Sequence, residues 1–321
     1  MEISVIMPVY NRCFEMKKAL ESLVAQTFKN FELIIIDDGS TDNILQTIFM
    51  YRDILDIKYI RVEHTENIAF LRNLGLRLSS GKYIAILDSD DWCVPNRLYM
   101  QYEYLEKHQD VDILATWVHI KNECEHLNNQ FLENLYNMEP SESGIIIKFL
   151  NEGCCICNST VMMRKCSVVE LGGYDERMHI CEDFNLWLRA FIKKFSIKIL
   201  DKKLVFRIIH KNSVTRGYDG SVKAIRLVIF NKLLYLFQSS IINNKGITIW
   251  GESARSEILV DLLAGFVNKN QVIRVVNVYD KKLPGIVMNS YNLVTTYTLK
   301  NSIFEYFDNN NLKIVEDYIY M

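Results

Sequence analysis

Short apolar segments alternate with helical segments from residue 3 to residue 92 of this 321-residue chain. Four mainly apolar segments are typical of buried strands: 3–9, 31–36, 58–62 and 83–87. Between them, residues 14–27 and 69–78 place apolar side chains at helical spacing. Because strands joined by helical crossovers pair in parallel, this alternation predicts an α/β fold with a doubly wound, mostly parallel sheet.

Three carboxylates end the fourth predicted strand. Asp88, Asp90 and Asp91 directly follow its apolar residues, and Ser89 separates the first two. Residues two apart on an extended chain point to the same side, so Asp88 and Asp90 can converge on one hard cation, which prefers oxygen ligands. The alternative is a turn with solvated acids, since Asp and Ser are good turn formers.

Polar residues also follow the other predicted strands. The segments that carry them are 8–11, 37–40 and 64–67. The carboxyl ends of parallel strands share one edge, and open α/β sheets bind their ligands there. Arg72 and Asn73 lie on the helix behind this edge, and an arginine can fork onto phosphate oxygens. A surface helix charge is the alternative for Arg72, but the combination suits a metal-bound phosphorylated ligand.

Four motifs, in this order, resemble those of the family 2 glycosyltransferases with the GT-A fold: VIMPVYNR, ELIIIDDGSTD, RNLGLRLSSGKYIAILDSDD and CEDFNLWLR. The resemblance covers residues 1 to about 215. It implies an inverting enzyme that moves a sugar from a nucleotide sugar, most often UDP-linked, to an acceptor hydroxyl, with Mg²⁺ or Mn²⁺ as cofactor. The chain lacks the Q-x-x-R-W motif and the membrane helices of processive members, which predicts transfer of one or a few sugars.

The resemblance also implies roles for single residues. The donor-binding residues would be Pro8, Val9, Tyr10, Asn11, Asp38, Arg72, Asp88 and Ser89. Among them, Asp38 would hydrogen-bond the base and Arg72 would contact the diphosphate. Asp88, Asp90 and His210 would bind the metal ion, and Asp183 would be the base that deprotonates the acceptor hydroxyl.

Several of these residues also have structural interpretations. Glu182 and Asp183 open a predicted helix, where acids favourably face the helix dipole. A histidine such as His210, after an apolar strand, is often structural. Residues 172–175 (GGYD) resemble the acceptor-side loop of the family, with a simple turn as the alternative.

Two other classes of function remain open at this point. A nucleotidyltransferase would share the metal and the α/β sheet, but it would carry a glycine-rich, basic loop after the first strand, and PVYNRCFEM is not such a loop. A non-catalytic glycan-binding scaffold would not need Asp38, Asp88, Asp90 and Asp183, all of which are present.

The composition changes near residue 216, which predicts a second, smaller α/β domain. We expect a GT-A domain over 1–215, an amphipathic helix with a linker over 216–243, and a Rossmann-like domain over 244–321. In that last domain Gly251 remains of the glycine pattern, whereas Ser253 and Ser256 take the other two positions. Since a serine Cβ obstructs a pyrophosphate, a scaffold or homo-oligomerisation role is favoured over cofactor binding. The chain ends soon after residues 314–320, which is consistent with an incomplete copy of this domain.

Charge and hydropathy limit the partners. The formal net charge of −2 argues against nucleic-acid binding. No signal peptide and no membrane-spanning apolar stretch are evident, so we expect a cytoplasmic protein. The basic amphipathic helix expected over 221–237 would suit peripheral contact with the inner face of the cytoplasmic membrane and a lipid-linked acceptor, a bacterial surface glycan such as capsule or lipopolysaccharide; core packing is the alternative. Cys154 and Cys157 form a C-x-x-C without a second ligand pair, which favours reduced thiols over a zinc site.

Overall fold

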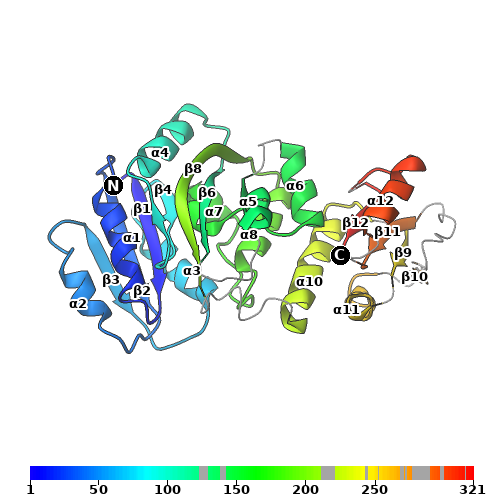
Figure 1. Cartoon of the computed structure of the whole chain (residues 1–321), viewed down its shortest axis with the longest axis horizontal. Coiled ribbons are helices and arrows are strands. Elements are labelled where there is room, and N and C mark those ends of the chain that lie inside the picture. The colour runs from blue at the N-terminus through cyan, green and yellow to red at the C-terminus, as the bar shows by residue number, and fades with distance from the viewer. Residues whose placement is uncertain are drawn as a thin grey trace. The chain divides into compact units, whose positions relative to one another are not determined.

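The computed structural model divides into two compact units (Figure 1). It describes residues 1–122, 129–137, 142–210, 221–242, 245–251, 253–267, 271, 273–276, 290–296, 300–314 and 316–321. The first unit comprises Met1–Glu142 with Cys154–Gly217, and the second comprises Ser143–Gly153 with Tyr218–Met321. The expected domain boundary at residue 215 lies close to the division between Gly217 and Tyr218. The segment Ser143–Gly153, however, belongs to the second unit although its neighbours on both sides belong to the first.

The first unit is built on an eight-stranded sheet with the order β3-β2-β1-β4-β7-β6-β8-β5. Its strands are β1 (Ile3–Val9), β2 (Phe31–Asp37), β3 (Ile57–Arg61), β4 (Tyr83–Ile86), β5 (Trp92–Cys93), β6 (Ile113–Asn122), β7 (Met162–Arg164) and β8 (Ile197–Ile209). The first four strands pair in parallel, as do β6 and β8. Strands β5 and β7 pair antiparallel with their neighbours. The prediction of a mostly parallel α/β sheet is therefore confirmed.

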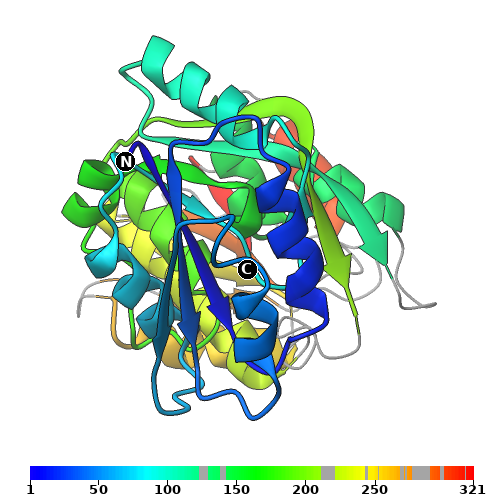
Figure 2. The same ribbon diagram turned by 90° about the vertical axis from the view of Figure 1, so that its left-hand side faces the viewer.

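Helices cover both faces of this sheet. They are α1 (Glu15–Val24), α2 (Ile44–Phe49), α3 (Ile68–Leu78), α4 (Arg97–Lys107), α5 (Asn129–Tyr136), α7 (Lys165–Glu170) and α8 (Glu182–Ile192), with a 3₁₀ turn, η1, at Asn158–Thr160. Alternate residues of β2 serve the two faces: Leu33 and Ile35 belong to the core cluster that contains Leu20 of α1, and Ile34 packs with Leu71 of α3. Figure 2 shows α1 beside the parallel strands drawn in blue.

A row of stacked aromatic rings lies at the edge of the sheet formed by β5, the strand that directly follows the acidic segment, residues 88–91. Trp92 of β5 stacks on Phe206 of β8 with ring centroids 5.4 Å apart, and Phe206 stacks on His119 of β6 at 4.4 Å. The Lys18 ammonium lies 5.0 Å from the Trp92 ring. Cross-strand aromatic pairs of this kind stabilise a sheet, so the short strand β5 has a fixed position. It thereby anchors the carboxylates that precede Trp92.

Residues 122–143 form a polar stretch of sequence without clear periodicity. Helix α5 forms within it, and the Asn137 amide that follows this helix bonds the backbone of Val118 on β6, at 2.7 Å to its N–H and 3.0 Å to its carbonyl oxygen. An eight-residue helix depends on such tertiary contacts more than on its own propensity, so the sequence carried little signal for it. Residues 123–128 and 138–141 lie outside the described part.

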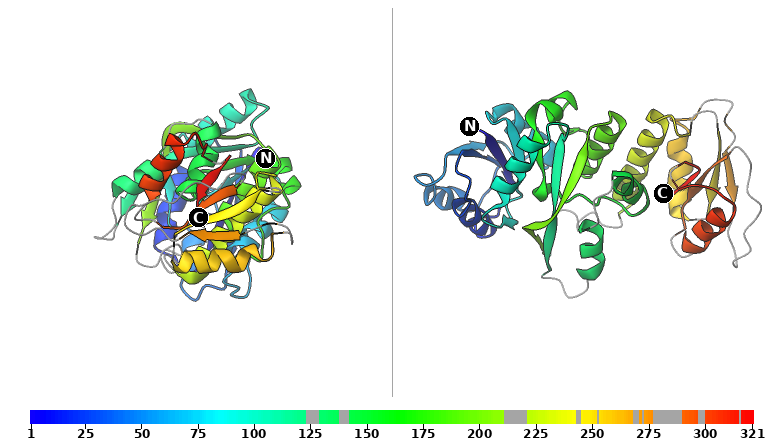
Figure 3. Two further views of the ribbon diagram at one scale, coloured as in Figure 1. Left: turned by 90° about the vertical axis from the view of Figure 1, so that its right-hand side faces the viewer. Right: turned by 90° about the horizontal axis from the view of Figure 1, so that it is seen from above.

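The second unit has a four-stranded, all-parallel sheet with the order β10-β9-β11-β12. Its elements are α6 (Glu142–Asn151), α10 (Val222–Gln238), β9 (Gly246–Trp250), α11 (Ala254–Leu263), β10 (Ile273–Val276), β11 (Ser290–Val294), α12 (Lys300–Asn309) and β12 (Tyr318–Tyr320). Figures 1 and 3 show α11 and α12 on opposite faces of this sheet. Trp250 packs edge-on against Phe307 of α12, with centroids 5.1 Å apart. The prediction of a second, smaller α/β unit is confirmed.

The expected basic amphipathic helix is α10, and Ser221 caps it by accepting a hydrogen bond from the Ala224 N–H. Its apolar residues Ile229, Leu233 and Leu236 are buried. Within the described residues, no helix has the length and apolar character that crossing a bilayer requires.

Candidate active site

The loops after β1 and β2 interlock at the carboxyl edge of the sheet. Pro8 and Val9 end β1, and Asn11 takes a left-handed conformation with φ of 50°. The Asn11 N–H donates to Ser40 Oγ at 2.9 Å, and the Thr41 N–H donates to Asn11 Oδ1 at 2.7 Å. These reciprocal bonds fix the surface formed by the predicted donor residues 8–11.

Tyr10 presents an exposed aromatic ring on this surface. The ring is 40% exposed and stacks on the His64 imidazole with centroids 4.0 Å apart and an interplanar angle of 14°. The loop that carries His64 is held by Asp38, whose Oδ1 accepts from the N–H and the hydroxyl of Thr65, both at 2.8 Å, and whose Oδ2 accepts from the Glu66 N–H at 3.1 Å. Asp38 thus fixes the loop beside Tyr10, and its predicted bond to a nucleotide base remains a prediction.

The acidic segment separates into two outward and two inward side chains. Asp88 and Asp90 are 32% and 23% exposed, whereas Ser89 and Asp91 are buried. The Ile208 N–H of β8 donates to Asp91 Oδ1 at 2.9 Å. Burial, with Asp90 and Asp88 nearby, raises the pKa of Asp91 well above its usual range. Asp88 and Asp90 are therefore the two carboxylates of this segment that a ligand can reach.

Strand β8 brings His210 to Asp90. The imidazole Nε2 lies 2.9 Å from Asp90 Oδ2, so two of the three predicted metal ligands are in direct contact. The third, Asp88, accepts a hydrogen bond from Arg72 Nη2 at 2.8 Å through Oδ1. No three His, Cys, Asp or Glu side chains of the described residues are grouped to hold a metal ion by themselves.

The chemistry of these residues nevertheless fits a divalent ion. Magnesium-like cations are usually held by one or two carboxylates plus the phosphate oxygens of the substrate rather than by a complete protein cage. Asp88 and Asp90 offer oxygen ligands at one strand end, and His210 offers a nitrogen beside them. A diphosphate would supply the remaining ligands.

Arg72 lies behind Asp88 in a buried setting. Nη1 donates to Glu182 Oε1 and Nη2 to Asp88 Oδ1, and the Asn158 amide, with its oxygen toward the guanidinium, accepts from Nε at 3.1 Å. The guanidinium carbon also lies 5.5 Å from the centroid of the Tyr174 ring. Burial alone would lower the pKa of Arg72, but Asp88 and Glu182 raise it, so the side chain is firmly cationic. Its predicted contact with a diphosphate remains a prediction.

Helix α8 begins with the two acids of the predicted base motif. The Phe184 N–H donates to Asp183 Oδ1 at 2.6 Å, and Cys181, at φ of 60°, turns the chain into the helix. Burial raises the pKa of Glu182 and of Asp183, and the nearby Arg72 guanidinium opposes the increase in both. A carboxylate with a raised pKa is a stronger proton acceptor, which suits Asp183 as a general base.

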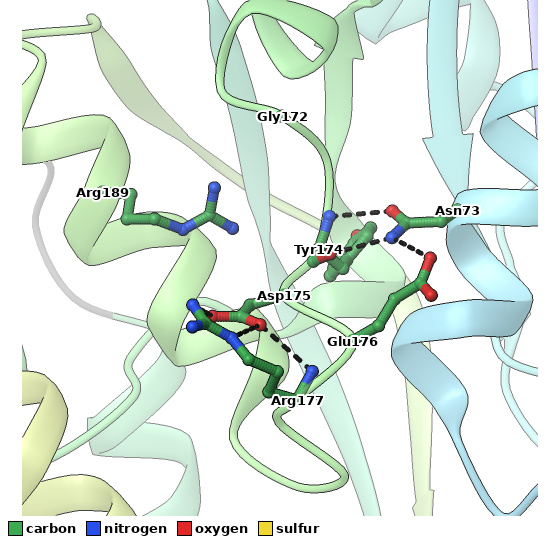
Figure 4. Close-up of a pocket in the computed structure, with 7 residues that line it drawn as sticks. All are labelled: Asn73, Gly172, Tyr174, Asp175, Glu176, Arg177 and Arg189. Carbon is green, nitrogen blue, oxygen red and sulfur yellow. Dashed lines mark hydrogen bonds and ion pairs between the residues drawn. The ribbon is translucent and has the colours of Figure 1, made fainter.

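The loop that precedes α8 is braced on both sides (Figure 4). From α3, Asn73 accepts from the Tyr174 N–H and donates to the Tyr174 carbonyl, both at 2.8 Å. From α8, Arg189 donates to the carbonyls of Leu171 and Gly173, both at 2.6 Å. These bonds hold the loop whose predicted role is to face the acceptor.

Two bracing residues, Asn73 and Arg189, received no such role from the sequence. The sequence predicts Asn73 near a phosphorylated ligand rather than as a brace. The one signal for the bracing role is that Asn73 stands next to Arg72 in the RNLG motif. Arg189 ends the CEDFNLWLR motif, and no sequence pattern assigns it a role in bracing the loop. Glu182 and Asn158 were missed as partners of Arg72 because both are far from it along the chain.

Replacing Gly173 with alanine is expected to destabilise the first unit by about 1 to 3 kcal/mol. Gly173 has φ of 70°, and an added Cβ would lie 2.5 Å from Asn73 Oδ1. Gly172→Ala is the matched control, since Gly172 has φ of 83° but an added Cβ would meet nothing within 4 Å. Urea unfolding of both variants measures the difference. Equal losses would show that the bond network around Asn73 does not depend on the glycine.

Comparison with known proteins assigns the family. Residues 4–170, just over half of the chain, match Glycosyl transferase family 2. The chain belongs to this family and is a glycosyltransferase. An uncharacterized glycosyltransferase, MJ1057 of Methanocaldococcus jannaschii, is 28% identical over 66% of this chain and 72% of its own length.

Two solved structures share the fold. S. aureus TarS 1–349 in complex with UDP-GlcNAc has a TM-score of 0.61 and 22% identity, over 82% of this chain and 72% of that one. The mannosyltransferase PcManGT of Pyrobaculum calidifontis, in complex with GDP-Man and Mn²⁺, has a TM-score of 0.53 and 15% identity, over 84% of this chain and 70% of that one. The predictions of family 2 and of the GT-A fold are confirmed.

Proposed function

We propose that this glycosyltransferase uses a UDP-sugar and a divalent ion, Mn²⁺ or Mg²⁺, to glycosylate a hydroxyl of a bacterial surface glycan such as capsule or lipopolysaccharide. The observation that carries the proposal is the placement of Asp88 and of the Asp90–His210 pair at the end of β4. The likeness to TarS, a structure that contains UDP-GlcNAc, supports the uridine nucleotide, and the likeness to PcManGT, which contains Mn²⁺, supports the metal.

The residues of the site would act in a single displacement. Tyr10 would stack on the base, and Asp88, Asp90 and His210 would hold the ion. When bound, this ion supplies positive charge for the departing diphosphate. Asp183 would accept the proton of the acceptor hydroxyl while that oxygen bonds to the anomeric carbon from the opposite face. The bond between the anomeric carbon and the diphosphate breaks, and its electron pair stays with the departing UDP. Because the acceptor attacks from the opposite face, the configuration at the anomeric carbon inverts.

The alternatives raised by the sequence are less well supported. Membership of the glycosyltransferase family argues against a nucleotidyltransferase. A non-catalytic scaffold function would not account for the contact between Asp90 and His210. We also propose that the second unit serves homo-oligomerisation.

Peripheral contact with the inner face of the cytoplasmic membrane is also part of the proposal. It would rest on exposed basic residues of α10 such as Lys223. Since Ile229, Leu233 and Leu236 of α10 are buried and cannot enter a bilayer, such contact would be mainly electrostatic.

Calorimetric titration with UDP tests the donor site. We expect binding that requires Mn²⁺ and that Asp90→Ala weakens more than about tenfold, because the ion loses one of its few protein ligands. Asp53→Ala is the matched control. This aspartate follows α2 in the sequence, is 86% exposed and pairs only with Arg52 among the described residues. Absence of UDP binding with and without Mn²⁺ would contradict the uridine assignment, and GDP would then be tested in the same way.

A further inference from the structure

Three charged side chains from distant parts of the first unit form one buried chain of ion pairs. Glu182 at the start of α8 bonds Arg72 of α3, and Arg72 bonds Asp88 at the end of β4. The side chains of Arg72 and Glu182 are only 5% and 10% exposed, whereas that of Asp88 is 32% exposed. We call this chain the Glu182–Arg72–Asp88 bridge.

The position of Arg72 within the bridge is fixed by neutral groups as well. The Asn158 amide and the Tyr174 ring hold the guanidinium from two further sides. Tyr174 is itself held to α3 by the two bonds of Asn73. Arg72 therefore cannot turn away from Asp88 without breaking several buried contacts.

This arrangement makes Arg72 a competitor for the charge of Asp88. A cation bound to Asp88 would share that carboxylate with a guanidinium only 2.8 Å away. Such repulsion between positive charges is strong where little water screens it, and the Arg72 side chain is only 5% exposed. Glu182 is the second carboxylate on Arg72, and its negative charge offsets the positive charge that Asp88 and the ion experience.

We propose that Glu182 is a positioning residue that sets the affinity of Asp88 for the divalent ion by neutralising Arg72. This inference rests on the proposed function, because it concerns the same metal-dependent donor site. It also ties the helix that carries Asp183 to the donor side, since Glu182 precedes the predicted base on the first turn of α8. Glu182 acts through Arg72 and touches neither donor nor acceptor in this scheme.

Glu182→Gln tests the proposal, because glutamine keeps the size and the acceptor oxygen but removes the charge. We expect the Mn²⁺ concentration for half-maximal UDP binding to rise about tenfold, a typical coupling between sites. UDP affinity at saturating Mn²⁺ should stay within about twofold of the wild type. A merely structural residue would lower the amount of folded protein without moving the Mn²⁺ midpoint.

Glu176→Gln is the matched control. Glu176 also accepts a hydrogen bond from α3, from Asn73 Nδ2 at 2.9 Å, and pairs with Arg77 at 3.6 Å, but within the described residues it makes no hydrogen bond or ion pair with Arg72. Its Mn²⁺ midpoint should equal that of the wild type. A shift equal to that of Glu182→Gln would overturn the proposal.

The double variant Arg72→Gln/Glu182→Gln provides a second arm with the opposite expectation. It removes both charges, so the Mn²⁺ midpoint should lie well below that of Glu182→Gln, while UDP affinity at saturating Mn²⁺ falls because the predicted diphosphate contact of Arg72 is lost. An unchanged Mn²⁺ midpoint in Glu182→Gln would overturn the proposal. A midpoint for Mn²⁺ about tenfold higher in the double variant than in the wild type would overturn it as well. If the wild type shows no Mn²⁺-dependent UDP binding at all, the proposed function fails rather than the role of Glu182.

Discussion

Asp183→Asn is expected to lower the rate of sugar transfer by about 10²- to 10⁴-fold and to leave UDP binding within about twofold of the wild type. The asparagine amide oxygen can still accept the bond from the Phe184 N–H, so the start of α8 should be preserved. It cannot accept a proton at neutral pH, and the acceptor hydroxyl would attack without a base. Transfer is measured as UDP release from the UDP-sugar that best supports turnover.

The pH dependence of the same reaction provides an independent check. Burial raises the pKa of Asp183, and a base works only when it is deprotonated. Activity should therefore decline on acidification at a higher pH than an ordinary aspartate would give, and Asp183→Asn should lose this acid limb.

Asp175→Asn serves as the control for the catalytic assignment. Asp175 lies in the adjoining loop, which is predicted to face the acceptor, and pairs with Arg177 at 2.7 Å, so it is a nearby acid with no predicted role in proton transfer. Its transfer rate should stay within about threefold of the wild type. Retention of more than a tenth of the activity in Asp183→Asn would show that another group is the base.

The positions of the donor-side residues could be predicted because they depend on short stretches of sequence. An apolar strand that ends in Asp88 and Asp90 places both at the ligand-binding edge of a parallel sheet, and the structure has them there. The position of His210 came from the family resemblance rather than from spacing, and it lies 2.9 Å from Asp90 across 120 residues of chain.

The partners of Arg72 could not be predicted in the same way. Its contact with Glu182 joins residues that are 110 positions apart and depends on how α3 and α8 pack. No periodicity or motif records that packing, and the CEDFNLWLR motif drew attention to Asp183 rather than to its neighbour. The diphosphate contact of Arg72 therefore remains a prediction, and its buried ion pairs are visible only in the structure.

The division of the chain was hidden for a related reason. Helix α6 lies between segments of the first unit along the sequence, but Asn151 at its end bonds the backbone of Tyr320 at 2.9 Å. Composition can only divide a chain into domains that are continuous in sequence. It therefore gives no sign that a short internal segment belongs to the other unit.

A buried lysine distinguishes the second unit. Lys232 of α10 is 3% exposed and donates to the Tyr320 carbonyl at 2.9 Å. Its charged neighbours among the described residues are Lys300 and Arg255, whose side chains also approach the Tyr320 ring. Burial first, and then these two cations, lowers the pKa of Lys232 to about 7.

The stability of the second unit is therefore expected to increase by about 2 kcal/mol between pH 6 and pH 9. The unfolded chain keeps the Lys232 proton up to the ordinary pKa of 10.5, whereas the folded unit releases it above about 7. The unfolded state thus binds more protons in this range, and the free energy of unfolding rises with pH. Pulse proteolysis in urea, with fragments of this unit identified by mass spectrometry, measures the change.

Lys232→Met should abolish this pH dependence. The variant loses the buried hydrogen bond to the Tyr320 carbonyl, so it should be less stable than the wild type at pH 9. At pH 6 the removal of a buried charge offsets that loss, and the two proteins should approach each other in stability. Lys245→Met is the matched control in the same unit, because Lys245 is 38% exposed and pairs with Asp317 at 3.3 Å, and it should retain the wild-type slope. The same slope in Lys232→Met as in the wild type would place the titrating group elsewhere.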